Sequence, residues 1–319
     1  MWRGILMTAF LVTGTVPTAL ADPVSATDEQ PNRIRIEYGE AKTPENRAVL
    51  KILQEHRALE RFQEIFSPFR LPVELTLRLK DCNGVSNSWY ERPTVTICYE
   101  YIEDIRKNLP ANNKPEDPVF VGISYRDAMF GQFFYVVAHE MGHAMFDLLD
   151  VPLFGRAEDA ADGFATYMML DLGKDEAQRL ILGAAYSYRE YVKNPRVCVP
   201  LIAFADAHSA PMQRFYNLLC IGYGANPTLF SDFVKKGFLP ENRADSCRTE
   251  YNEVNFAFHQ VIAPHLDPKL AKLVLDKTWL PPQEPGPSTP VSLRDTRHSP
   301  GEYFNMCVNF SLPLGNARD

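Results

Sequence analysis

The chain has 319 residues and an ordinary globular composition, with 45% hydrophobic and 23% charged residues. Its formal net charge is −7, from 33 Lys and Arg against 40 Asp and Glu. It therefore has no basic excess of the kind that binds nucleic acid or an anionic membrane, and we expect neither partner.

Residues 1–21 have the features of a secretory signal peptide. One arginine precedes a short apolar run, and the segment ends in the small-residue sequence ALA at residues 19–21. The run is too short, and too diluted by Thr and Gly, for a membrane anchor. We therefore expect cleavage after Ala21 and an exported protein, periplasmic or secreted. No later segment has the apolar length to span a bilayer, so no membrane span is expected after cleavage.

The first part of the mature chain changes from polar to periodic sequence. Residues 22–44 are polar, and we expect a flexible leader there. In residues 45–66, apolar side chains such as Val49, Leu53 and Phe62 recur at helical spacing and predict a helix. The main domain is therefore expected to begin at residue 45.

Two runs with strict alternation of apolar and polar residues follow. They are VELTLRLK at 73–80 and TVTICYE at 94–100, and each predicts a half-buried strand. The turn-rich connection between them is flanked by Cys82 and Cys98. We interpret the two runs as a small antiparallel sheet with a disulfide closing its connection.

The second half of the chain is mostly helical in pattern. After the break at ANNKPEDP, residues 111–118, comes a long apolar stretch. Further helices are expected at roughly 157–172, 174–192, 209–224 and 241–262. The proline-rich segment at 281–290 predicts a linker, so residues 281–319 form linker and C-terminal tail. The pattern predicts a mostly helical α+β fold over residues 45–280.

The six cysteines of an exported chain predict three disulfides. None lies in a CxxC pair, which gives no support to a cysteine-based zinc or redox motif. Six cysteines allow fifteen connectivities, and buried free thiols are the alternative. We predict the pairs Cys82–Cys98, Cys220–Cys247 between successive helices, and Cys198–Cys307 to tether the tail.

The apolar stretch carries the sequence HEMGH at residues 139–143. His139 and His143 are four residues apart, so on a helix their rings project from one face and can share one metal ion. Glu140 is close enough in phase to hold and deprotonate a water molecule. This HExxH arrangement is typical of zinc-activated water attacking a peptide carbonyl. The alternative is two helix histidines packed in a core.

A catalytic zinc site usually takes three protein ligands. The first helix should end near residues 150–152, because proline cannot continue it, and Gly155 allows a turn into a second helix. Glu158 and Asp162 are four apart on one face of that second helix, and a buried carboxylate needs a partner. We assign Glu158 as the third ligand and Asp162 as the carboxylate that orients a ligating imidazole. Asp162 could itself ligate, and an acidic first turn also stabilises a helix without any metal.

HExxH followed by ExxxD on the next helix resembles the gluzincin clan of zinc metallopeptidases, of which thermolysin is the familiar member. The connection between His143 and Glu158, residues 144–157, is shorter than in thermolysin-like enzymes. A closer resemblance is to a bacterial metallopeptidase family that carries a domain of unknown function. It rests on NSWY…TVTICYEY, AHEMGHAMFDLLDVPLFGRAEDAAD, DAHSAPMQRFYNLLCIGYG and LPENRADSCRTEY, which cover most of residues 80–265.

The resemblance implies a zincin-like fold, in which a small antiparallel sheet packs on the active-site helix, with Zn²⁺ as cofactor and a peptide or protein as substrate. NSWY at residues 87–90 is similar to the edge strand with which thermolysin-like enzymes bind the substrate backbone. It makes Asn87 and Trp89 candidate substrate-binding residues. The alternative is a polar loop with two packing aromatics.

Gluzincins also need a donor for the tetrahedral oxyanion, often His or Tyr. His208, Tyr216 or Tyr223 could supply it, and the alternative for His208 is a structural histidine next to a helix start. The function predicted is an exported zinc metallopeptidase with Glu140 as general base. The alternatives are a catalytically silent zinc-binding protein and a cell-envelope interaction protein without metal. Glu140 argues against a purely structural metal site, which needs no base.

Overall fold

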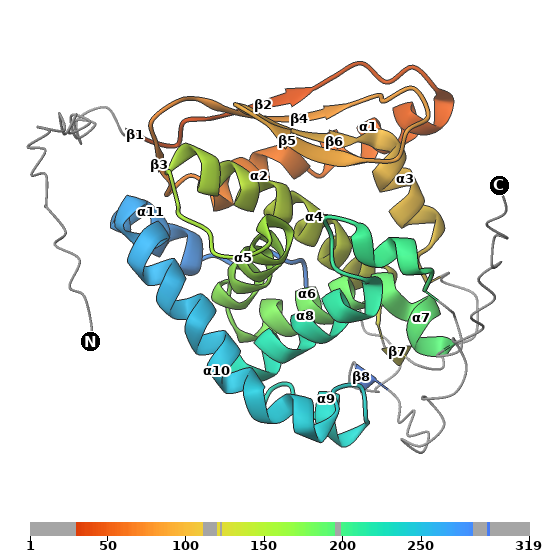
Figure 1. Ribbon diagram of the computed structural model, residues 1–319. Coiled ribbons are helices and arrows are strands. Elements are labelled where there is room, and N and C mark those ends of the chain that lie inside the picture. Colours follow the sequence, from red (N-terminus) through yellow and green to blue (C-terminus); the bar gives the residue numbers. More distant parts are fainter. Residues whose placement is uncertain (1–29, 111–119, 122, 195–198, 283–291, 294–319) are drawn as a thin grey trace, which may run out of the picture.

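The computed structural model describes residues 30–110, 120–121, 123–194, 199–282 and 292–293. In this part of the chain a four-stranded sheet lies along one side of a larger body of helices (Figure 1). The mostly helical α+β class is therefore confirmed. The predicted signal peptide, most of the predicted linker and the predicted Cys198–Cys307 pair lie outside the described residues.

The four strands of the main sheet lie in the first third of the chain, and helices predominate after it. The strands are β1 Gln30–Pro31, β2 Ile34–Tyr38, β3 Arg70–Leu71, β4 Leu75–Lys80, β5 Ser88–Glu91, β6 Thr94–Cys98, β7 Phe120–Val121 and β8 Ser292–Leu293. The α-helices are α1 Pro44–Glu55, α2 Ala58–Ile65, α3 Tyr99–Lys107, α4 Tyr125–Leu148, α5 Ala157–Asp171, α6 Lys174–Ala185, α7 Arg189–Lys193, α8 Pro211–Ala225, α9 Asp232–Lys235, α10 Glu241–Ala257 and α11 Pro268–Leu275.

The main sheet has the strand order β2-β4-β6-β5. Strands β2, β4 and β6 are parallel, and β5 alone runs antiparallel, against β6. The predicted antiparallel pairing of the runs 73–80 and 94–100 is therefore wrong, since Leu77 pairs with Val95 in a parallel ladder. The reason is β5, which reverses the chain before β6 begins. Alternation of side chains shows which face of a strand is buried and carries no information on its direction.

The N-terminal segment also contributes to the sheet. Strand β2 lies inside the range 22–44 that was expected as a leader, and it pairs with β4. Ile34 of β2 is buried, as its alternation with charged neighbours allows. The predicted helix over 45–66 is two helices, α1 and α2, separated at Arg57, whose φ of 50° is left-handed and cannot continue a helix.

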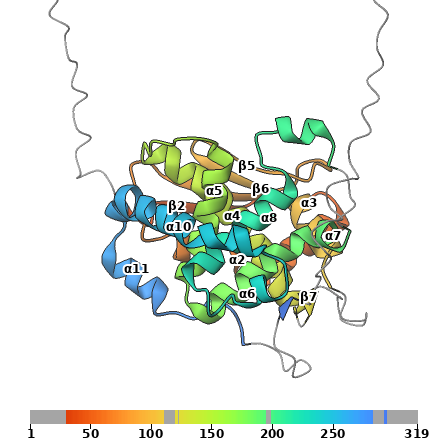
Figure 2. The ribbon, with the colours of Figure 1, turned by 60° about the horizontal axis from the view of Figure 1, so that its bottom comes forward.

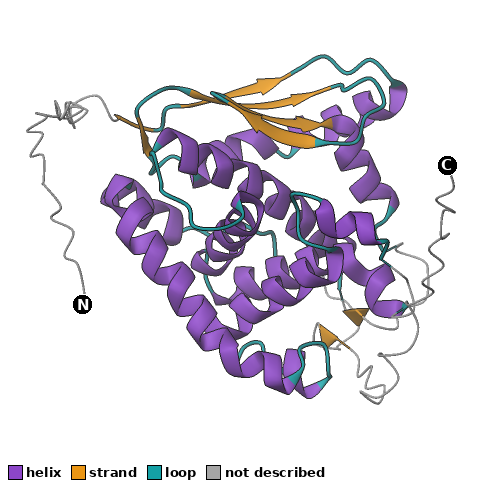
Figure 3. Ribbon diagram, viewed as in Figure 1, coloured by secondary structure: helices purple, strands orange, loops and turns teal. Residues whose placement is uncertain are grey.

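The helices cover only one face of the sheet in the described part of the chain (Figure 3). That face carries the fully buried Leu75, Leu77 and Leu79 of β4 beside Val95 and Ile97 of β6. Helix α4 lies between the sheet and the helices α5 and α6, and Figure 2 shows it surrounded by neighbouring elements. It is therefore apolar on nearly all sides, as the sequence of residues 133–148 indicated.

Helix α4 is fixed in place by a close crossing with α6. A Cβ atom at Gly183 of α6 would lie 2.1 Å from the carbonyl oxygen of Asp127 in α4, so only glycine fits at this contact. Arg179 of α6 also forms a 2.7 Å ion pair with the buried carboxylate of Asp127. The helix that carries HEMGH is thus held through both backbone contact and charge.

Both predicted disulfides within the described residues form. Cys82–Cys98 closes the connection that contains β5, and Cys220–Cys247 joins α8 to α10. Two disulfides are compatible with an exported protein, because they persist in oxidising compartments. Among the helices of the described part, none has the length and hydropathy to cross a bilayer.

Candidate functional site

Helix α4 presents the two histidines of the HExxH sequence on one face. The rings of His139 and His143 lie 4.9 Å apart, and their Nε2 atoms are separated by 3.2 Å. His139 is almost fully buried, whereas His143 is partly open to a cleft. The i, i+4 spacing therefore brings two ring nitrogens together, as expected from the helix period.

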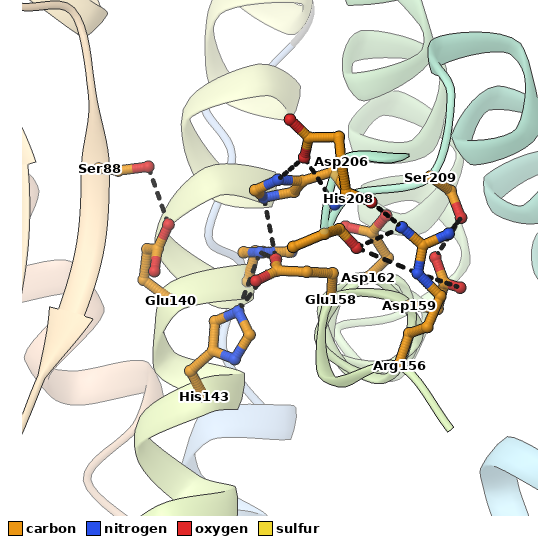
Figure 4. A network of polar contacts seen from close by, with 12 residues as sticks. Ser88, Glu140, His143, Arg156, Glu158, Asp159, Asp162, Asp206, His208 and Ser209 are labelled. Atoms are coloured by element: carbon orange, nitrogen blue, oxygen red, sulfur yellow. Dashed lines mark hydrogen bonds and ion pairs between the residues drawn. The ribbon is translucent and has the colours of Figure 1, made fainter. Parts of the chain in front are cut away.

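Helix α5 brings a carboxylate to the same point. The chain leaves α4 through a loop in which Gly155 has a φ of 109°, a conformation that favours glycine, and α5 then begins at Ala157. Glu158 in its first turn places Oε2 at 3.0 Å from His139 Nε2 and 3.2 Å from His143 Nε2 (Figure 4). Three potential ligand atoms thus converge on one position.

This convergence fits a divalent metal ion. Bonds of about 2.1 Å in a tetrahedral site place neighbouring ligand atoms about 3.4 Å apart, slightly more than the separations among these three atoms. Asp162 Oδ1 lies 2.7 Å from His139 Nδ1 and accepts a hydrogen bond from it. His139 Nε2 faces His143 Nε2 and Glu158 Oε2, and a metal ion bound there would take the lone pair of the neutral ring.

The charges around the three atoms also favour a bound cation. Burial acts to lower the pKa of His139, but the carboxylates of Asp162 and Glu158 outweigh it and raise the pKa to about 9. The hydrogen bond with His139 lowers the pKa of Glu158 to about 2. Burial acts to raise the pKa of Asp162, yet its partners His139 and Arg214 hold it well below the ordinary value. The two carboxylates therefore stay ionised and favour positive charge at the ring nitrogens.

Glu140 is turned toward the sheet and away from these three ligand atoms (Figure 4). Its side chain is buried at the base of the cleft, and Oε1 accepts a 2.9 Å hydrogen bond from Ser88 Oγ of β5. The carboxylate is thus held beside the histidines without joining their cluster.

Strand β5 forms one wall of the cleft and the edge of the main sheet. The N–H of Cys98 donates to the carbonyl of Asn87 at 3.0 Å, so by alternation the backbone groups of Ser88 and Tyr90 point away from β6. They point to the edge where β5 pairs with no other strand of the described residues, called the open edge below. The predicted residues Asn87 and Trp89 both line the cleft. The ring of Trp89 lies under the Lys80 ammonium, on the face opposite Ser88 and Tyr90.

His208 lies on the loop before α8, and about half of its side chain is exposed. Its Nε2 is 2.9 Å from Glu158 Oε2, and its ring stacks on His139 with centroids 5.9 Å apart. His208 and His143 approach Glu158 from opposite sides (Figure 4). Arg156 fastens this loop, because its guanidinium donates to the carbonyl oxygens of Asp206 and Ala207.

The other two donor candidates lie elsewhere. Tyr216 and Tyr223 of α8 are partly buried against the core, and neither lines the cleft. Helix α8 carries them away from its own N-terminus, which is the end near the site. The structure therefore brings together His208, Glu140 and the three ligand atoms, and it leaves both tyrosines apart.

The cleft has a volume of about 700 Å³. Its walls are β5, the C-terminal half of α4, residues 151–153, the first turn of α5 and His208. A family model whose description reads "Putative metallopeptidase" matches residues 38–262. The chain belongs to this family.

The match extends from the end of β2 to the turn after α10 and includes every residue of the cleft. Membership of a metallopeptidase family implies a metal ion, hydrolase activity and peptide or protein substrates, and the His139–His143–Glu158 group is the place that could hold the metal. Comparison with curated proteins and with solved structures gave no match.

Three residues of this candidate site were missed from the sequence. Ser88 holds Glu140, Arg156 holds the loop of His208, and Arg214 of α8 forms two hydrogen bonds with Asp162. Each contact joins residues about fifty positions apart in sequence. The spacing of residues along a helix or strand indicates only which residues of that element share a face. It therefore could not predict these contacts between distant elements.

Proposed function

We propose that the protein is an exported, zinc-dependent metallopeptidase with a gluzincin-like site on a zincin-like fold. His139, His143 and Glu158 hold the zinc ion. The observation that carries the proposal is the convergence of their three ligand atoms within 3.0–3.2 Å, with Glu140 beside them in an open cleft. Two imidazoles and one carboxylate are a donor set typical of catalytic zinc.

A zinc ion bound there supplies a Lewis acid that polarises the substrate carbonyl and lowers the pKa of water. Glu140 acts as general base, accepts the proton of the attacking water and passes it to the leaving amine. The hydrogen bond from Ser88 fixes one carboxylate oxygen and leaves the other for water. Asp162 orients His139 through Nδ1, which keeps Nε2 directed at the cleft.

The open edge of β5 supports a peptide substrate. An extended peptide can add to such an edge through backbone hydrogen bonds, and Ser88 and Tyr90 present the groups required. Their position in the wall of the cleft would bring the peptide backbone beside Glu140. This arrangement explains binding of a peptide main chain without specifying its side chains.

His208 is our candidate for the donor that stabilises the oxyanion. It lies on the opposite side of Glu158 from His143, at the mouth of the cleft, and Asp206 Oδ1 lies 3.2 Å from its Nδ1. That contact involves Nδ1 only, and Nε2 points to Glu158 Oε2 at 2.9 Å, beside the place where a substrate oxygen would meet the metal. Oxyanion stabilisation needs donors placed before the reaction, and the Arg156 anchor provides such placement.

The test compares the wild type with Glu140→Gln and Glu158→Gln, all purified without affinity-tag metals. Glu140→Gln keeps the size of the side chain but cannot accept a proton, so zinc content should stay near wild type. Hydrolysis of a peptide library should fall by roughly a hundredfold or more. Glu158→Gln should instead lose zinc first. Glu241→Gln, on the exposed start of α10, is the matched control.

Two results would contradict the proposal. Loss of zinc in Glu140→Gln would place this residue among the ligands, and full activity in it would remove its role as base. A wild type that binds zinc and cleaves no peptide of the library would instead indicate a catalytically silent zinc protein.

A further inference from the structure

The segment 206–214 holds both carboxylates that α5 directs at the site. Glu158 and Asp162 are four residues apart on α5. His208 contacts Glu158 at 2.9 Å on the cleft side, and Arg214 contacts Asp162 at 2.7 Å on the buried side. Arg214 has no role in the chemistry described so far.

Arg214 binds Asp162 in the bidentate manner that best fixes a carboxylate. Its Nε donates to Oδ2 and its Nη2 donates to Oδ1, both at 2.7 Å. The same Oδ1 also accepts the 2.7 Å hydrogen bond from His139 Nδ1. Because both oxygens are occupied by one planar guanidinium, the carboxylate cannot rotate without losing a hydrogen bond.

The surroundings of Arg214 make the pair rigid. Its side chain is about one-fifth exposed, and the guanidinium lies 5.9 Å from the ring of Tyr135. Tyr135 precedes His139 by one helical turn on α4, and its hydroxyl is buried without a hydrogen-bond partner in the described residues. A buried carboxylate is costly unless it is paired, so the charge of Arg214 is what allows Asp162 to remain there.

We propose that Arg214 is a positioning residue of the metal centre, acting through Asp162 to fix the ring of His139. The inference rests on the proposed function, since it assigns His139 as a ligand. The chain of contacts runs from α8 through α5 to α4 and ends at the ring nitrogen on the cleft side. Helix α8 thereby sets the direction of a ligand on another helix.

The rival interpretation is a purely structural ion pair between α5 and α8. Such a pair would contribute to the free energy of unfolding and leave the metal affinity unchanged. The two interpretations predict different zinc affinities for variants of Arg214 and Asp162. If Arg214 acts through Asp162, the double variant loses no more zinc affinity than Asp162→Asn alone.

The experiment measures zinc dissociation constants by chelator competition for the wild type, Arg214→Met, Arg214→Lys, Asp162→Asn and the double variant Arg214→Met/Asp162→Asn. Arg214→Met should weaken zinc binding by about tenfold to a hundredfold. Arg214→Lys keeps the charge but cannot donate two parallel hydrogen bonds to Asp162, so its zinc affinity should lie between those of the wild type and Arg214→Met. The double variant should bind zinc about as weakly as Asp162→Asn alone, because both changes break one chain of contacts.

The matched control is Arg243→Met. Arg243 forms a comparable ion pair with Glu250 on α10 and does not line the cleft. It should lower the unfolding temperature and leave zinc affinity unchanged. The visible spectrum of the cobalt-loaded protein, which responds to ligand geometry, should change in Arg214→Met and stay constant in Arg243→Met.

The inference is overturned if Arg214→Met binds zinc as tightly as the wild type. It is also overturned if the loss of zinc affinity in the double variant equals the product of the losses in Arg214→Met and Asp162→Asn. Should Arg214→Met fail to fold, Arg214→Lys decides, and wild-type affinity in it overturns the inference. A wild type that binds no zinc contradicts the proposed function instead, so the two failures are distinguishable.

Discussion

The two sides of the cleft differ in how firmly they hold their residues. On the helix side, His139 and Asp162 are buried between α4 and α5, and α4 is itself pinned to α6 at Gly183. On the other side, His208 and Arg156 are each close to half exposed, on loops rather than inside helices. The fold thus holds the proposed ligand His139 and its partner Asp162 inside packed helices and leaves His208, the proposed oxyanion donor, nearer the surface.

This difference suggests a division of tasks. A metal centre needs ligand atoms at set separations, which packed helices supply. A peptide has to enter and its products have to leave, which is easier at a strand edge and a loop. The four predictions below test this division, in order of decreasing effect on activity.

Replacing a residue of the helix side should abolish the site. His143→Ala removes one of the three proposed ligands, so bound zinc should fall from about one per chain to near zero, and activity should be lost with it. Metal analysis after dialysis checks the result. His56→Ala, at an exposed histidine next to α1, should keep full zinc content. Unchanged zinc in His143→Ala would refute the ligand assignment.

Replacing a residue of the loop side should separate activity from metal. His208→Ala should keep its zinc, while kcat falls by roughly a hundredfold to a thousandfold, the usual effect of losing an oxyanion donor. KM should change little, because the donor acts in the transition state. Zinc loss as large as in His143→Ala would show that His208 is a ligand and would remove the distinction between the two sides.

The strand side should show a smaller effect. Ser88→Ala deletes the hydrogen bond to Glu140 Oε1 and leaves the carboxylate less well oriented. A hydrogen bond to a charged group contributes about 1.5–3 kcal/mol, so activity should fall by about tenfold to a hundredfold, with zinc retained. Steady-state kinetics provides the measurement. Ser187→Ala, at an exposed serine outside the cleft, should behave as the wild type.

The two disulfides provide the mildest test. Cys82→Ser/Cys98→Ser frees the connection that contains β5, which should cost about 2–4 kcal/mol of stability and raise KM by roughly a few-fold. Cys220→Ser/Cys247→Ser, between α8 and α10, should lose similar stability with KM unchanged. Denaturant unfolding and kinetics on both variants measure the two quantities. Equal KM changes would mean that the disulfide beside β5 has no special relation to substrate.

The parts of the site predicted from the sequence are those that depend on one helix or on neighbouring elements. The period of a helix was enough to place His139 and His143 together. The proline that ends the first helix and the turn at Gly155 were enough to predict that the next helix, α5, brings Glu158 and Asp162 near them. The Cys82–Cys98 pair was likewise local, because it flanks a single connection.

The parts that were missed depend on how distant elements pack. Arg214 meets Asp162 across 52 positions of sequence, and nothing in the pattern of α8 distinguishes it from a surface arginine. The direction of β6 was also missed, because it depends on β5, a strand of four residues with a polar start that resembles a loop. Short strands and ion pairs between helices are set by tertiary contacts rather than by local sequence.

The open edge of β5 has a consequence for turnover. An unpaired strand edge receives another copy of the chain as readily as a substrate, and sheets limit such pairing by keeping their edges short. With only Ser88 and Tyr90 directing backbone groups outward, β5 can hold a peptide through a few hydrogen bonds at most. The cleaved halves of a peptide share even these few bonds. In the proposed binding mode, the short edge would favour rapid departure of products over tight capture.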